Sequence, residues 1–178
     1  MESIKITKDM TMSQILEAYP GAQRALFQGF HIGGCQSCGF SENDTLEQVC
    51  KNHQLEVEPV IAHVYKSYEL DQKIQVAPKE VAEMLKRKEK FKLLDVREPW
   101  EHELAHIEGA ILVSDDSIVQ EIMTWPKDTT IIVHCHQGMR SLDAASYLIG
   151  HGFTNVRSIA GGINAWSKEV DTKVPTYV

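Results

Sequence analysis

Hydrophobic and polar positions follow two different periods along this chain of 178 residues. Up to about Tyr68, apolar residues recur at three- and four-residue spacings, which is typical of helices with one buried face. From Ile74 onward, short apolar runs alternate with helical stretches, as in chains that build strands and helices in turn. The change falls at residues 69–72, a largely polar stretch without a core pattern. We therefore expect two domains, residues 1–69 and residues 70–178.

Two capping signals divide the first segment into helices. Thr11 with Gln14 has the spacing of a capping box, in which each side chain bonds to the other residue's backbone N–H. Asp44 with Glu47 repeats this signal before a second apolar stretch. No convincing strand pattern accompanies them, so we expect a small all-α N-terminal domain. The expected helices cover residues 12–19, 20–27, 45–53 and 59 onward, with a loop over 30–43.

The second segment predicts an α/β fold with a parallel sheet. Strand–helix alternation is typical of parallel sheets with helices on both faces and reactive groups at the carboxyl ends of the strands. Asp95 ends one apolar run and Cys135 follows another, so both are expected at that edge of the sheet. The expected strands are 74–76, 91–95, 110–112, 130–134 and 155–159, and the expected helices begin near 78, 117, 141 and 162.

Composition and charge narrow the classes of partner. The chain is 43% hydrophobic and 24% charged, as in an ordinary globular protein, and its net charge of −7 argues against nucleic acid or an anionic membrane as partner. Neither a signal peptide nor a membrane-spanning run is apparent in the sequence. Four cysteines without a secretion signal suggest the reducing cytoplasm, where thiols are catalytic, metal-binding or redox-active.

Cys135 is the strongest candidate for a reactive group. It follows the apolar run 130–134 and precedes a helical pattern over 141–149. A cysteine on such a strand-to-helix loop has backbone N–H groups and a helix N-terminus near its sulfur, and Arg140 adds positive charge. Gly138 suits a tight loop that requires a positive φ. A buried structural thiol is the alternative, but this setting favours a nucleophile.

Four stretches of the second segment resemble the rhodanese family of sulfurtransferases: residues 94–101, 106–110, 135–141 and 161–166. The resemblance spans about residues 74–170 and implies the single-domain rhodanese fold. It also implies a ping-pong reaction without a cofactor, in which Cys135 takes sulfur from a small-molecule donor, holds it as a persulfide and passes it to a thiol or a protein acceptor. The implied active-site loop is His136, Gln137, Gly138, Met139, Arg140 and Ser141, with Asp95 and Arg97 as scaffold beneath it.

The roles within this loop leave alternatives open. Arg140 is a candidate to bind departing sulfite, and its alternative role is a structural pairing with a carboxylate such as Asp95. His136 and Gln137 are expected at the rim. Cysteine phosphatases and arsenate reductases typically place five residues between Cys and Arg, whereas four separate Cys135 from Arg140, a tighter ring suited to one sulfur atom. Two further alternatives are not enzymes: a sulfide or redox sensor, in which modification of Cys135 changes how the first domain contacts a partner, and a sulfur-carrier protein.

The N-terminal segment carries a second cysteine motif. His31 to Cys38, followed by Thr45 to Cys50, resembles a small helical domain of unknown function that is found alone or fused to redox and sulfur proteins. Cys35 and Cys38 have the spacing of a metal-ligand pair or a dithiol. We rank a dithiol that exchanges with Cys135 first, a metal or iron–sulfur site second and inert packing third. His31 and Cys50 would complete a set of four metal ligands with Cys35 and Cys38. Cys50 continues an apolar helix face and is instead expected in the core, and capping of a loop is the alternative role of His31.

Overall fold

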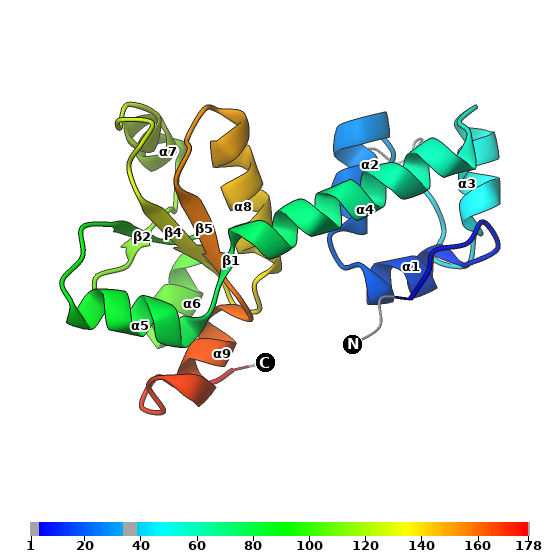
Figure 1. Cartoon of the computed structure of the whole chain (residues 1–178). Helices are drawn as coiled ribbons and strands as arrows, with labels where there is room; N and C mark the ends of the chain where they lie inside the picture. Colours follow the sequence, from blue (N-terminus) through cyan, green and yellow to red (C-terminus); the bar gives the residue numbers. More distant parts are fainter. Residues whose placement is uncertain (1–3, 34–38, 178) are drawn as a thin grey trace. The chain divides into compact units, whose positions relative to one another are not determined.

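The computed structural model describes residues 4–33 and 39–177 and divides the chain into two compact units, Met1–Lys73 and Ile74–Val178 (Figure 1). The boundary expected after residue 69 falls inside a helix, α4 (Val57–Ile74). The polar stretch that suggested a linker continues this helix, because the buried Asp71 side chain forms an ion pair with Arg24 in the same unit. Hydrophobic patterning missed this part of the helix because an ion pair, rather than an apolar contact, holds it.

The first unit is helical, as expected. Its other helices are α1 (Met12–Ala18), α2 (Ala22–Phe30) and α3 (Leu46–Asn52). The capping box of Thr11 and Gln14 is confirmed at the start of α1. The expected box of Asp44 and Glu47 is wrong by one residue: Thr45 and Gln48 cap α3, while the Asp44 carboxylate accepts a bond from the Ser41 N–H at 2.8 Å. The core consists of Ile6, Met12, Ile15, Tyr19, Ala22, Ala25, Leu26, Ile32, Leu46, Val49, Cys50, Val60 and Val64.

The second unit is built on a five-stranded sheet in which every pairing is parallel, in the order β1-β5-β4-β2-β3. All five strands lie where the apolar runs predicted them, and the central strand β4 is buried along its whole length, as a continuous apolar run suggests. Asp95 pairs in register with His134, so the ends of two strands meet immediately before Cys135. The strands are β1 (Gln75–Val76), β2 (Lys92–Asp95), β3 (Ile111–Leu112), β4 (Ile131–His134) and β5 (Val156–Ile159).

Helices cover both faces of this sheet, which confirms the α/β prediction (Figure 1). On the central strand β4, Ile132 packs into one core cluster, and Ile131 and Val133 pack into the other, as alternation along a strand requires. The short helix α6 was not predicted, because its six residues are too few to show a repeating apolar pattern. The helices are α5 (Pro78–Lys86), α6 (Pro99–Leu104), α7 (Asp116–Met123), α8 (Met139–Gly150) and α9 (Gly162–Glu169).

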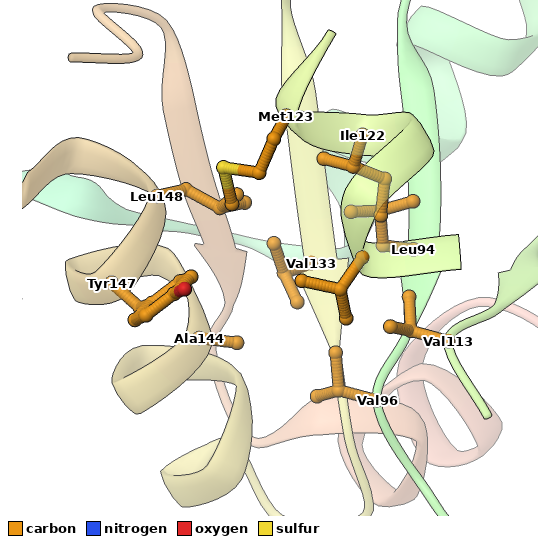
Figure 2. Close-up of a pocket in the computed structure, with 10 residues that line it drawn as sticks. Leu94, Val96, Val113, Ile122, Met123, Val133, Ala144, Tyr147 and Leu148 are labelled. Carbon is orange, nitrogen blue, oxygen red and sulfur yellow. The ribbon is translucent and has the colours of Figure 1, made fainter. Parts of the chain in front are cut away.

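An apolar cavity of about 290 Å³ lies between α7, α8 and the sheet (Figure 2). Figure 2 shows Tyr147 and Leu148 of α8 facing Met123 and Ile122 of α7, with Val133 of β4 at its floor. Half of the Tyr147 side chain is exposed. The lining offers neither a charge nor a nucleophile, so we assign the cavity to packing. Among the described residues, no helix combines the length and apolar character needed to cross a membrane.

Candidate active site

Cys135 lies between the buried strand β4 and the start of α8. Gly138 is the N-cap of α8 and has a φ of +99°, as the sequence suggested for a tight loop. The Gly138 N–H donates to the Cys135 Sγ over 3.1 Å, so a backbone amide at a helix N-terminus points at the sulfur. Such an amide and the helix dipole both favour negative charge on sulfur. Cys135 itself is only 1% exposed, so a donor must reach it through the loop.

The first turn of α9 holds the backbone of this loop. The carbonyl oxygens of Cys135 and His136 accept bonds from the N–H groups of Ile163 and Asn164, at 2.8 and 3.0 Å. The close approach requires glycine at Gly162, because a Cβ there would lie 2.3 Å from the Cys135 oxygen. These bonds hold the loop backbone while the Gly138 N–H faces the sulfur.

Arg140 forms an ion pair with a carboxylate, that of Glu101 rather than that of Asp95. Its two terminal nitrogens donate to the Glu101 carboxylate at 2.6 and 2.8 Å, so the suggested pairing with Asp95 is wrong. Hydrogen bonds from Arg140, from the Glu98 N–H and from Tyr177 outweigh the effect of burial and lower the pKa of Glu101 to about 2. Glu101 is therefore a carboxylate at neutral pH, and it holds the end of the loop against α6.

Asp95 and Arg97 form a fully buried pair below the loop. Arg97 Nε donates to Asp95 Oδ1 at 2.8 Å, and Arg97 also bonds to the carbonyl oxygens of Glu101 and Ala105. Burial would raise the pKa of Asp95, but its bonds to Arg97 and His102, with the neighbouring charges, lower it overall. This pair fixes the turn between β2 and α6, and so places Glu101 for Arg140.

A model of the rhodanese-like domain matches residues 77–169, more than half of the chain, which include every strand but β1 and all of the loop described above. The chain belongs to the rhodanese-like family. Rhodanese sulfurtransferases act without a cofactor.

Several known proteins are similar to this chain. The thiosulfate sulfurtransferase GlpE of Pseudoalteromonas translucida is 38% identical over 87 residues, which are 49% of this chain and 83% of that protein. The adenylyltransferase and sulfurtransferase UBA4 of Candida albicans is 37% identical over 116 residues, 61% of this chain, which spans only 26% of that longer relative. The crystal structure of reduced CoADR-RHD from Bacillus anthracis shares the fold, with a TM-score of 0.50 at 23% identity, covering 76% of this chain and 21% of that one.

The other side chains of the rhodanese loop differ in where they point. Ser141 is fully buried; its hydroxyl donates to the Gly138 oxygen at 3.1 Å and accepts from Ser158 at 2.8 Å, so it supports the loop from below. Gln137 and Met139 are exposed at the rim. His136 is half-buried and stacks on Tyr177, with ring centroids 4.2 Å apart.

The sequence did not single out three residues around the site: Glu101, His134 and Tyr177. Burial lowers the pKa of His134 to about 4, and both of its ring nitrogens lack hydrogen-bond partners although Asp95 lies 3.8 Å away. His134 is therefore neutral at neutral pH. Glu101 had a sequence signal, since Glu98 and Glu101 form a capping box at the start of α6. Tyr177 had none, because it lies beyond every motif.

The N-terminal motif belongs to the first unit, Met1–Lys73. Cys35 and Cys38 lie outside the described residues, so the ranking of dithiol, metal site and packing stays a prediction. His31 is exposed and ends α2 in a left-handed conformation, with φ of +57°. Cys50 is buried in the helical core, as expected. Within residues 4–33 and 39–177, no group of three or more His, Cys, Asp or Glu side chains is placed to hold a metal.

Proposed function

We propose that this protein transfers sulfane sulfur through a persulfide on Cys135. The observation that carries the proposal is the Gly138 N–H, which points at the Cys135 sulfur from the N-terminus of α8. Support comes from the relatives, two of which are named as sulfurtransferases. The loop is a short cradle for one anionic sulfur, since only four residues separate Cys135 from Arg140.

In the first half-reaction, the Cys135 thiol loses its proton to solvent, and the thiolate attacks the outer sulfur of the donor. With thiosulfate as donor, a new S–S bond forms to Cys135, the S–S bond of thiosulfate breaks, and sulfite leaves with the electron pair. The product is a persulfide anion, which the Gly138 amide and the positive end of α8 stabilise. Arg140, with 44% of its side chain exposed, offers the departing sulfite a cation at the rim.

In the second half-reaction, an acceptor thiolate attacks the outer sulfur of the persulfide. The S–S bond to Cys135 breaks, the Cys135 thiolate leaves, and the acceptor carries the sulfur away as its own persulfide. A small-molecule thiol fits the open rim formed by Gln137 and Met139. We propose thiosulfate as a donor because the GlpE relative is named for it and this chain covers 83% of that protein. A protein acceptor is a second candidate, since the UBA4 relative joins sulfur transfer to adenylyl transfer in its name.

The test is the intact mass of the protein after thiosulfate treatment without an acceptor. We expect one added sulfur atom, removable by cyanide or a thiol, and no addition to the Cys135→Ser variant. Cys50→Ser is the matched control, because Cys50 is equally buried but has no place in this loop. Loading of Cys135→Ser to the wild-type level would disprove the assignment. Steady-state turnover with a thiol acceptor separates an enzyme from a sensor, and turnover of an aryl phosphate would instead favour a phosphatase.

A further inference from the structure

The segment that follows α9 returns to the loop through one side chain, Tyr177. Its ring stacks on His136, with centroids 4.2 Å apart and planes at 12°. The indole of Trp100 meets the same ring edge-on, at 5.9 Å and 71°. Because His136 directly follows Cys135, this stack fixes the backbone at the start of the loop. The His136 Nε2 is buried and has no hydrogen-bond partner, so stacking is the main contact of that ring.

The Tyr177 hydroxyl joins the two charge pairs under the loop. It accepts a bond from Arg97 Nη1 at 2.8 Å and donates to Glu101 Oε1 at 2.7 Å. The same Glu101 carboxylate receives both nitrogens of Arg140. Arg140 ends the loop that Cys135 begins. One phenol therefore reaches both ends of the loop, directly at His136 and through Glu101 at Arg140.

We propose that Tyr177 is a positioning residue for persulfide formation, holding both ends of the Cys135 loop so that the Gly138 amide faces the sulfur. The inference rests on the proposed function. Burial and the bond to Glu101 raise the pKa of Tyr177, so the hydroxyl keeps its proton and remains a donor at neutral pH. A displacement of reacting groups by about 1 Å can slow a reaction about 100-fold. Loss of the ring and hydroxyl together is therefore expected to slow sulfur loading.

The test is the rate constant of persulfide formation, measured by rapid quenching with thiosulfate and intact mass. Tyr177→Leu, which loses the stack and the hydroxyl, should load about 10-fold more slowly, and Tyr177→Phe, which keeps the stack, about 3-fold more slowly. Thr172→Ala, at an exposed position of the same segment, should load at the wild-type rate. A purely structural role would lower the amount of active protein, and hence the final extent of loading, without changing the rate constant.

A double-mutant cycle tests the route through Glu101. In a Glu101→Ala background, Tyr177→Phe should have a smaller effect than in the wild type, because the hydroxyl has lost its link to Arg140 and keeps only its bond from Arg97. Wild-type rate constants in both Tyr177 variants would overturn the inference and leave the proposed function standing. If the wild-type protein takes up no sulfur from thiosulfate, the proposed function is disproved, and the inference that rests on it is disproved as well. If Tyr177→Leu fails to fold, Tyr177→Phe and the cycle decide, since the phenyl ring keeps the packing.

Discussion

Cys50 and Cys135 are both free thiols with 1% exposure, yet their surroundings differ. Cys50 lies on α3 in the helical core beside Val49, and burial, followed by the charge of Glu58, raises its pKa. Cys135 lies at a strand-to-helix junction, with the Gly138 N–H 3.1 Å from its sulfur. Exposure therefore does not distinguish Cys135, the proposed nucleophile, from Cys50 in the helical core. The available hydrogen-bond donors do.

The source of these donors is the backbone rather than a side chain. The amides at the start of α3 are occupied by its own capping box, and Cys50 sits in the middle of that helix, where the amides bond to the preceding turn. Around Cys135, N–H groups of α9 donate to the carbonyl oxygens of Cys135 and His136, and the Gly138 N–H donates to the sulfur. Backbone amides near Cys50 thus bond within their own helix, whereas the Gly138 amide bonds to the Cys135 thiol.

The largest effect is expected from removing each of the two thiols in turn. Cys135→Ala should abolish sulfur loading, because no other described thiol has an amide donor. Cys50→Ala should load fully but lose about 1–2 kcal/mol of unfolding free energy, since it leaves a cavity in the helical core. Intact mass after thiosulfate and thermal unfolding measure the two properties. Loss of sulfur loading in Cys50→Ala would contradict the assignment of loading to Cys135 alone.

A second large effect is expected at the glycine that lets α9 approach the loop. Gly162→Ala should slow loading about 100-fold, because its Cβ would displace the Cys135 and His136 carbonyls from positions 2.3 and 2.6 Å away. Its φ of +58° adds strain. Gly150→Ala is the matched control, since a Cβ there meets nothing within 4 Å, and it should load normally. Equal rates in the two variants would mean that α9 does not shape the loop.

Much of this fold follows from the sequence, for identifiable reasons. The five strands fall on short, mostly apolar runs between helical stretches, of which β4 is buried along its whole length, so their positions were predictable to within a residue or two. The start of α3 was off by one because Asp44 and Thr45 are both good capping residues, and only the geometry chooses between them. Helix α6 was missed because its six residues, with Trp100 and Leu104 as the larger apolar ones, are too few to establish a helical period.

The loop around Cys135 was predictable because its donors are local backbone groups. The partners of its charged residues were not. Arg140 pairs with Glu101, 39 positions away, and Arg97 bonds to Tyr177, 80 positions away. Such contacts depend on how β2, α6 and the segment after α9 come together, which residue spacing along the chain does not encode. The choice of Asp95 as a partner for Arg140 failed for this reason.

A third prediction concerns pH and the histidine that precedes Cys135. Burial lowers the pKa of His134 from 6.5 to about 4 in the folded protein. Between these values the unfolded chain binds more protons, so stability is complete above pH 6.5 and falls as the pH drops toward 4, by roughly 3 kcal/mol in total. Urea unfolding at several pH values measures this slope. His134→Phe should flatten it, and an unchanged slope would assign the acid sensitivity to other groups.

The smallest effect is expected from the side chains that follow each cysteine at the surface. Gln137 is exposed at the rim, and the described structure gives it no hydrogen bond, whereas Lys51 is exposed beside Cys50 on α3. Truncating an exposed side chain usually changes free energies by less than about 0.5 kcal/mol, a factor of about 2 in rate. Gln137→Ala should therefore load sulfur from thiosulfate within about 2-fold of wild type, and Lys51→Ala should be indistinguishable from it. A 10-fold lower loading rate in Gln137→Ala would show that a side chain at the rim, and not the backbone alone, promotes sulfur loading.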